Sequence, residues 1–137
     1  MPLQLLIFDL DGTLVDSRFD LADAVNHAMK KLDRPTISYE QLPGLLGSGL
    51  NHLLKTAANS SEKALLHTAR KHFDDYYEAH YVHKTRPYPG VLSTLRELSK
   101  RSQLAVYSNK LQYFTTKVIE GLDLASFFDI IQGAAPE

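Results

Sequence analysis

Two carboxylates, Asp9 and Asp11, lie one residue apart directly after a short apolar run, residues 5–8, and ahead of Gly12 and Thr13. Such a run is typical of a parallel strand that is buried on both faces. Ligands of open α/β sheets bind at the carboxyl ends of the strands, and Gly12 permits a turn that aims both side chains at one ligand. One carboxylate can then act as a nucleophile while its neighbour transfers a proton. The alternative is an Asx-type turn without chemistry, but such a turn requires no apolar run before it.

The positions of the apolar residues predict the elements that hold these aspartates. Short apolar runs indicate strands at residues 5–8, 104–107 and 127–131, the last of them closed by Gly133. Between the first two strands the apolar residues keep helical spacing, and the resulting order is typical of a parallel sheet with helical crossovers. We therefore expect an α/β fold with a Rossmann-like parallel core of about three strands. The core would comprise residues 1–15 and 86–137, with an all-helical domain, residues 16–85, inserted after the first strand.

Local signals predict the ends of the helices in the inserted block. Asp16 or Ser17 can cap the first helix, which stops before Pro35. Residues 38–41 have the spacing of a capping box and predict a short helix that ends near residues 43–44. Two further helices follow, and the second carries an aromatic stripe that indicates packing or a dimer seam more than a base-stacking surface. The stripe consists of Phe73, Tyr76, Tyr77 and Tyr81.

The composition excludes several classes of protein. The 15 Lys and Arg against 16 Asp and Glu give a net charge of -1, which argues against a nucleic-acid or acidic-membrane partner. The chain has no cysteine, so it has no disulfide, no thiolate nucleophile and no Cys-ligated metal site. Its start lacks the basic region of a signal peptide, and no apolar stretch is long enough to span a bilayer. We expect a soluble, cytoplasmic protein.

Three segments resemble the motifs of one family, the haloacid dehalogenase-like hydrolases. Residues 6–17, LIFDLDGTLVDS, are similar to the first motif of that family along their whole length. Residues 86–91, RPYPGV, resemble the return of the chain to the core after a helical cap, and residues 106–110, VYSNK, resemble the second motif. The resemblance covers almost the whole chain and points to the phosphoglycolate phosphatase-like branch, which carries such a cap.

The resemblance implies a phosphatase for a small phosphorylated metabolite, with phosphoglycolate as the nearest guess. Asp9 would attack phosphorus to form an aspartyl-phosphate, and Asp11 would protonate the leaving alkoxide and then deprotonate the attacking water. Mg²⁺ would bind the Asp9 carboxylate and the Asp11 backbone carbonyl. Thr13, Ser108 and Asn109 would bind the phosphate of the substrate, a small phosphate ester.

The sequence departs from the family pattern in its last part. The third motif, with its charge-neutralising lysine, and the fourth, an acidic pair that completes the Mg²⁺ site, are absent from these 137 residues. Lys110 can replace that lysine in phosphate binding only if it points at the phosphate, and the alternative is a solvated lysine at a helix start. The chain resembles a family member truncated after the third core strand. Its first strand would keep an unpaired edge, which invites a homodimer.

Weaker signals lie in the helical block. Gly47, Ser48 and Gly49 lie where relatives carry the substrate-specificity loop of the cap, and a plain connector is the alternative. His80 and His83 share a predicted helix face and could ligate a metal, but half-packed or solvated histidines are the better interpretation.

Two other functions stay open beside the phosphatase. A sugar-phosphate mutase would use the same Asp9 and Asp11. A catalytically incomplete fragment or interaction module would keep the fold and lack turnover. Asp11 argues against a haloacid dehalogenase, because that reaction has no leaving alkoxide to protonate.

Overall fold

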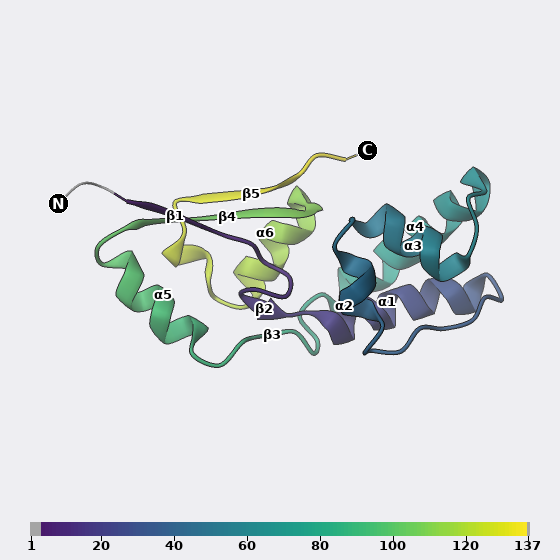
Figure 1. Cartoon of the computed structure of the whole chain (residues 1–137), viewed down its shortest axis with the longest axis horizontal. Helices are drawn as coiled ribbons and strands as arrows, with labels where there is room; N and C mark the ends of the chain where they lie inside the picture. The colour runs from purple at the N-terminus through teal and green to yellow at the C-terminus, as the bar shows by residue number, and fades with distance from the viewer. Residues whose placement is uncertain (1–3, 137) are drawn as a thin grey trace. The chain divides into compact units, whose positions relative to one another are not determined.

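The computed structural model describes residues 4–136 and divides the chain into two compact units (Figure 1). The first, the sheet unit, combines the chain up to Ser17 with the chain from Thr85 onward. The second, the helical unit, comprises Arg18–Lys84. Each unit is described separately below.

The sheet unit contains three parallel strands, which confirms the predicted α/β class. β1 (Leu5–Phe8) pairs with β4 (Gln103–Leu111), and β4 pairs with β5 (Ile130–Ala134), in the order β1-β4-β5. Phe8 lies opposite Val106, and Val106 lies opposite Ile131. The carboxyl end of β1 therefore lies beside Val106, where the second predicted motif begins, so the first two motifs are neighbours in the sheet.

Two helices and a short 3-10 helix complete the sheet unit. α5 (Val91–Ser99) precedes β4, α6 (Gln112–Gly121) follows it, and a 3-10 turn, Ala125–Phe127, leads into β5. Burial of apolar side chains is the main stabilising contribution here, since these side chains leave water almost completely. The fully buried core residues from these elements are Leu95, Leu104, Val106, Val118, Ile119 and Leu124.

Two predicted strand limits are wrong. The second strand continues to Leu111, so Ser108, Asn109 and Lys110 belong to it, although its pairing with β5 is irregular between Tyr107 and Leu111. The third strand begins at Ile130, because the apolar run before it first forms the 3-10 turn. Gly133, expected to close this strand, lies within it.

The chain passes between the two units twice, and a short antiparallel pair of strands joins these two segments. The sequence did not predict this pair. β2 (Val15–Asp16) pairs with β3 (Arg86–Pro87), with Val15 opposite Pro87. The backbone N–H of Tyr88 also donates to the Leu14 carbonyl at 3.1 Å. Two-residue strands carry too little periodicity to be recognised in a sequence.

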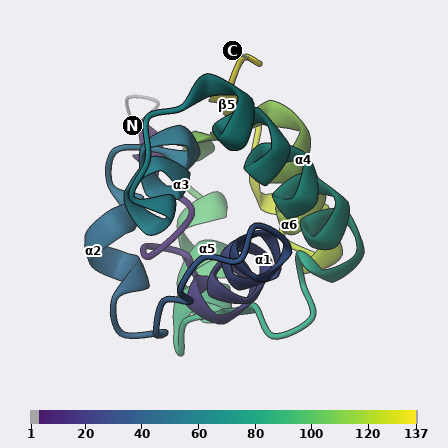
Figure 2. The ribbon, with the colours of Figure 1, turned by 90° about the vertical axis from the view of Figure 1, so that its right-hand side faces the viewer.

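The helical unit contains four helices, which are labelled in Figure 2, where α1 is seen along its axis. They are α1 (Arg18–Lys31), α2 (Leu42–Leu46), α3 (Leu50–Ala58) and α4 (Lys63–His80). α1 and α4 pack along their lengths, and Phe73 and Tyr77 of the aromatic stripe are each only 1% exposed. The packing interpretation of the stripe is therefore confirmed for these two residues.

The predicted short helix begins and ends further along the chain than expected. Ser38 and Gln41 do exchange the two hydrogen bonds of a capping box, with Ser38 N to Gln41 Oε1 at 2.8 Å and Gln41 N to Ser38 Oγ at 3.3 Å. The helix itself, α2, then runs through Pro43 and Gly44 instead of ending there. Proline is tolerated in a first helical turn because its missing N–H has no intrahelical partner there.

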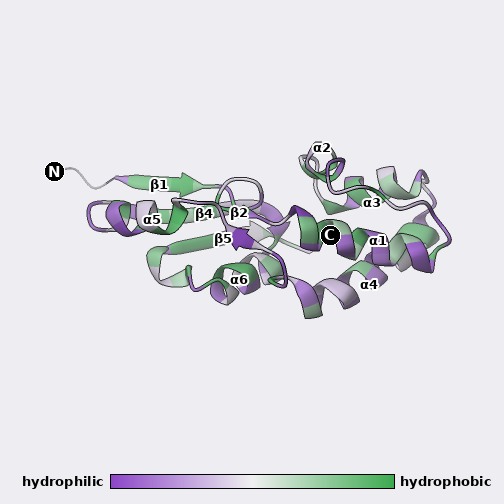
Figure 3. Cartoon of the chain, turned by 90° about the horizontal axis from the view of Figure 1, so that it is seen from below, coloured by the Kyte–Doolittle hydropathy of each residue, from purple (hydrophilic) through white to green (hydrophobic). Residues whose placement is uncertain are grey.

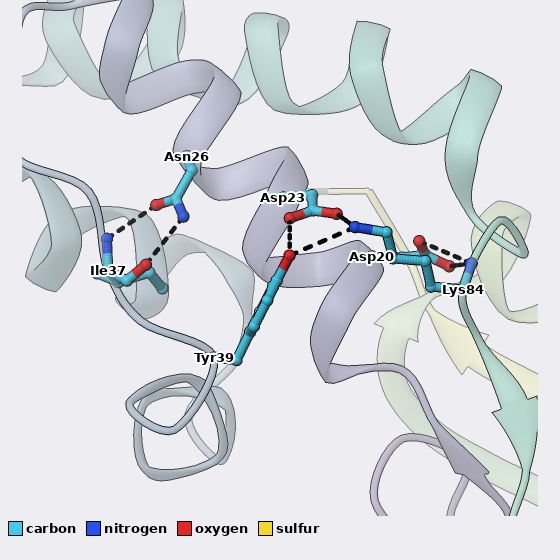
Figure 4. A network of polar contacts seen from close by, with 6 residues as sticks. All are labelled: Asp20, Asp23, Asn26, Ile37, Tyr39 and Lys84. Carbon is cyan, nitrogen blue, oxygen red and sulfur yellow. Dashed lines mark hydrogen bonds and ion pairs between the residues drawn. The ribbon is translucent and has the colours of Figure 1, made fainter.

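A polar network closes the helical unit where its two ends meet (Figure 4). The backbone N–H of Lys84 donates to both oxygens of the buried Asp20, at 3.0 and 2.8 Å. The Lys84 ammonium donates to Asp23 at 2.7 Å, and the Tyr39 hydroxyl donates to the same carboxylate at 2.7 Å. The hydrogen bonds of the Lys84 ammonium raise its pKa, and the bond to Asp23 contributes more than the bond to Tyr39.

One face of the sheet leaves large apolar side chains in solvent, and Figure 3 colours β1 as hydrophobic. Ile7 lies opposite Ala105, and Ala105 lies opposite Ile130, so these residues share one face, with Leu5 and Tyr107 two positions along their strands. Ile7 and Tyr107 are each 64% exposed. None of the described helices is long and apolar enough to cross a membrane.

Candidate active site

The first aspartate lies in solvent at the end of β1. Asp9 is exposed, and its Oδ1 accepts a hydrogen bond from the backbone N–H of Leu10 at 2.8 Å. Leu10 itself is fully buried and anchors the chain just beyond the strand. One carboxylate oxygen of Asp9 is therefore restrained by the backbone of the next residue, and Asp9 stays exposed.

Several backbone N–H groups of the turn after Asp9 converge on one carbonyl oxygen. The backbone N–H groups of Thr13, Leu14 and Val15 all lie within 3.2 Å of the Leu10 carbonyl oxygen. Gly12 donates to the Val15 carbonyl at 2.9 Å and adopts a φ of 81°, a conformation that glycine adopts without steric cost. The turn is thus rigid, and it leaves Thr13 exposed at its tip.

The second aspartate is buried against a lysine from the other end of the chain. The Lys110 Nζ lies 3.1 and 3.0 Å from the two oxygens of Asp11, and the side chains are only 8% and 10% exposed respectively. The Ser17 hydroxyl also donates to Asp11 Oδ1 at 2.6 Å. Asp9 and Asp11 therefore have different environments, one in solvent and one in an ion pair.

The backbone of Lys110 is fixed by hydroxyl groups on both sides. Its N–H donates to Ser108 Oγ at 3.1 Å, and its carbonyl accepts a hydrogen bond from Thr115 Oγ1 at 3.1 Å. Ser108 is 5% exposed and Thr115 is fully buried. The end of β4 and the first turn of α6 therefore fix the backbone from which the Lys110 side chain extends.

A glutamine clamp fixes β5 beside this segment. Gln112 Oε1 accepts the Gly133 N–H at 2.7 Å, and Gln112 Nε2 donates to the Ile131 carbonyl at 3.0 Å. A Cβ at position 133 would lie 2.6 Å from the Gln112 Cα and 2.7 Å from the Lys110 carbonyl oxygen. Gly133 is thus a close-approach residue, because no larger side chain fits between β5 and α6.

The structure places the predicted site residues in two groups. Asp9, Asp11, Thr13 and the segment 108–110 all belong to the sheet unit, and Asp11, Lys110 and Ser108 are linked by the hydrogen bonds above. Asn109 is exposed on β4. The residues Gly47, Ser48 and Gly49 connect α2 to α3 in the helical unit.

The two histidines weighed as metal ligands do not share a helix face. α4 ends at His80, and His83 lies beyond it, with the ring centroids 5.8 Å apart. The His80 Nδ1 also lies 2.7 Å from the Tyr76 carbonyl oxygen. The half-packed interpretation holds for His80, whose ring stacks on Tyr76 at 3.9 Å.

Sequence reasoning missed Ser17 as a partner of Asp11. It was considered only as a helix cap, although it directly precedes α1 and its hydroxyl donates to Asp11. The signal was present, since Ser17 is the last residue of the first motif. The Gln112 clamp had no signal in the sequence.

The donor set determines which metal the site can hold. Among residues 4–136 no cluster of three or more His, Cys, Asp or Glu side chains is arranged to hold a metal ion. Mg²⁺ in phosphate enzymes takes one or two carboxylates and completes its shell with water and substrate phosphate. The exposed Asp9 carboxylate and the neighbouring backbone carbonyl of Asp11 fit that kind of site and do not fit an all-protein cage.

Comparison with known proteins identifies the family. The family model for haloacid dehalogenase-like hydrolases matches residues 6–137. The chain belongs to this family. A haloacid dehalogenase-like hydrolase from Streptococcus pneumoniae is similar over 98% of this chain and 63% of its own, with a TM-score of 0.86 and 28% identity. These family members share the parallel sheet and helices described above.

The family branch is also supported by curated relatives. The phosphoglycolate phosphatase of Aquifex aeolicus is 35% identical over 136 residues, which cover 96% of this chain and 61% of that protein. A structure from Haemophilus somnus, titled as a predicted phosphoglycolate phosphatase, matches with a TM-score of 0.89 and 28% identity over 98% of this chain and 65% of that one. The chain thus spans about 61% of the length of the Aquifex relative.

Proposed function

We propose that this family member carries the nucleophile and the proton-transfer group of a Mg²⁺-dependent phosphatase for a small phosphate ester of the phosphoglycolate kind. The observation that carries the proposal is the contrast between the two aspartates. Asp9 is exposed at the end of β1, whereas the Asp11 side chain is only 10% exposed and forms an ion pair with Lys110. Two carboxylates in different environments are suited to two different roles.

The proposed reaction has two displacements. A carboxylate oxygen of Asp9 attacks phosphorus, the bond from phosphorus to the ester oxygen breaks, and Asp11, which must enter this step protonated, gives that oxygen its proton. Water then attacks the aspartyl-phosphate, Asp11 takes one proton from the water, and inorganic phosphate leaves with Asp9 regenerated. The exposed position of Asp9 supports the first role, because an attacking oxygen must reach the substrate.

Hydrogen-bond donors at the carboxyl end of the sheet would hold the phosphate. We assign this role to Thr13 at the exposed tip of the turn and to Ser108 and Asn109 at the end of β4. Phosphoryl transfer depends mainly on positioning and on compensation of charge, which such donors provide. Lys110 stands in the ion pair with Asp11 and is treated separately below.

The Asp9 carboxylate and the Asp11 backbone carbonyl would hold Mg²⁺, which compensates negative charge on phosphate and carboxylate when it is bound. The site needs that charge. A phosphate monoester carries negative charge, and the attacking group is itself a carboxylate.

The helical unit would act as a cap, residues 16–85, with Gly47, Ser48 and Gly49 contacting the substrate. This role is supported by the connection of the helical unit, since the chain leaves and re-enters the sheet unit through the β2 and β3 pair. Gly49 has a φ of 90° just ahead of α3, so the loop has a defined conformation. A cytoplasmic setting agrees with the absence of cysteine.

The first experiment measures hydrolysis of p-nitrophenyl phosphate by this chain with and without Mg²⁺, with Asp9→Asn as the blank. We expect Mg²⁺-dependent turnover that the blank lacks. No turnover above the blank from a folded sample would contradict the proposal for this chain. It would favour the alternative of a catalytically incomplete fragment or interaction module.

A further inference from the structure

We propose that Lys110 is a positioning residue that orients the Asp11 carboxylate for proton transfer, and that it does not bind the substrate phosphate. This inference rests on the proposed function. The sequence allowed two interpretations of Lys110, phosphate binding or solvation, and the proposal gives this lysine a different role.

The contacts of Asp11 support this assignment. Both of its oxygens lie within 3.1 Å of the Lys110 Nζ, and Oδ1 also accepts from the Ser17 hydroxyl at 2.6 Å. A carboxylate held by two donors from different parts of the chain has one orientation. That orientation fixes where its proton can be delivered.

The surroundings of Lys110 favour the position of its ammonium group beside Asp11. Hydrogen bonds to Ser108 and from Thr115 fix its backbone, and its side chain is only 8% exposed. Moving the ammonium to a phosphate oxygen would break its two contacts with the Asp11 oxygens, at 3.1 and 3.0 Å. By contrast, Asp9 is exposed and is the group that phosphate would approach.

The two roles predict different dependence on the leaving group. Protonation by Asp11 matters for an alkyl phosphate, whose alkoxide leaves poorly, and matters little for p-nitrophenyl phosphate, whose phenolate leaves unaided. Binding of the phosphate group is the same for both substrates. Loss of a positioning residue should therefore slow the alkyl ester selectively, whereas loss of a phosphate-binding residue should slow both equally.

The test compares Lys110→Met with wild type on 2-phosphoglycolate and p-nitrophenyl phosphate. The quantity measured is kcat/KM, because it reports the step in which the ester bond breaks. We expect a loss of about 100-fold or more for phosphoglycolate and less than about fivefold for the aryl ester. Lys110→Arg should restore most of the loss. Lys100→Met is the control, since Lys100 pairs with Glu97 at 3.0 Å in a 69% exposed ion pair.

Equal losses on both esters, or a rise in KM alone, would overturn the inference while leaving the phosphatase proposal intact. If wild type shows no turnover above Asp9→Asn, the proposed function fails for this chain. A double-mutant cycle then decides about Lys110, with urea unfolding of Lys110→Met, Asp11→Asn and the double variant. Coupling of tenfold or more in the unfolding constant supports the positioning contact, and additive effects overturn it.

Discussion

Replacement of Gly133 by alanine should destabilise the sheet unit through one new carbon atom. The added Cβ would lie 2.6 Å from the Gln112 Cα and 2.7 Å from both the Gln112 N and the Lys110 carbonyl oxygen. All three are backbone atoms, so no flexible side chain can move aside. Gly133 has no positive φ, and the cost therefore comes from contact and not from its own backbone conformation.

The expected cost follows from the cost of overpacking. An extra methyl group in a well-packed interior costs about 1–3 kcal/mol, and a contact with fixed backbone belongs at the upper end. The same displacement would stretch the Gly133 hydrogen bond to Gln112, now 2.7 Å, which adds roughly 1 kcal/mol. We therefore expect a loss of about 3 kcal/mol in the free energy of unfolding.

Urea unfolding followed by circular dichroism measures this loss. Gly44→Ala is the matched control, because nothing lies within 4 Å of a Cβ there and Gly44 lies in α2. Alanine in a helix should stabilise by about 0.5–1 kcal/mol, so the two substitutions should have opposite signs. A Gly133→Ala variant as stable as wild type would refute the close packing of β5 against α6.

Three further predictions concern other parts of the chain. The pKa of His27 is lowered in the folded protein, mainly by burial and then by the charges of Lys31 and His72. The unfolded chain therefore binds a proton at this residue at a higher pH than the folded protein does. Its contribution to stability is present above about pH 6.5 and is lost as the pH falls below that value. His27→Gln should therefore reduce the fall in thermal midpoint between pH 7 and pH 5, and an unchanged slope would contradict this. Asp20→Asn should cost about 1–3 kcal/mol in urea unfolding, because one of the two oxygens that accept from Lys84 N becomes a donor. An unaltered midpoint would show that the closure of the helical unit is dispensable. We also expect self-association through the edge of β1, measured by size-exclusion chromatography with light scattering, which Ile7→Lys should abolish. A monodisperse monomer of the wild-type chain would count against a homodimer.

Most of the sheet unit could be predicted from the sequence because its strands are apolar runs of distinctive length. The runs coincide with β1 and with the first part of β4. The expected burial on both faces is wrong for β1, because Leu5 and Ile7 are 46% and 64% exposed, whereas the apolar residues 104–106 of β4 are buried. Their limits could not be predicted as well. A polar residue such as Ser108 stays in a strand when its hydroxyl finds a backbone partner, here the N–H of Lys110.

The two aspartates of the site could be predicted from the sequence, but the contacts between the site residues could not. Asp9 and Asp11 stand out because of their spacing and the run before them. The Lys110 contact to Asp11 spans 99 residues, and only the pairing of β1 with β4 brings the two together. Local patterns carry no information on such a pair, so Lys110 stayed between two interpretations until the register was known.

The charge of the site and the unpaired edge of β1 are related. Within residues 4–136, β1 pairs with β4 on one side and with no strand on the other. Parallel strands place their carboxyl ends along one edge of a sheet, so any strand that pairs with β1 in parallel would also end beside Asp9. A partner that covers the apolar edge can thus supply further charged side chains to the phosphate site. If Lys110 is committed to Asp11, such a partner is a source of positive charge for the phosphate in addition to the proposed Mg²⁺.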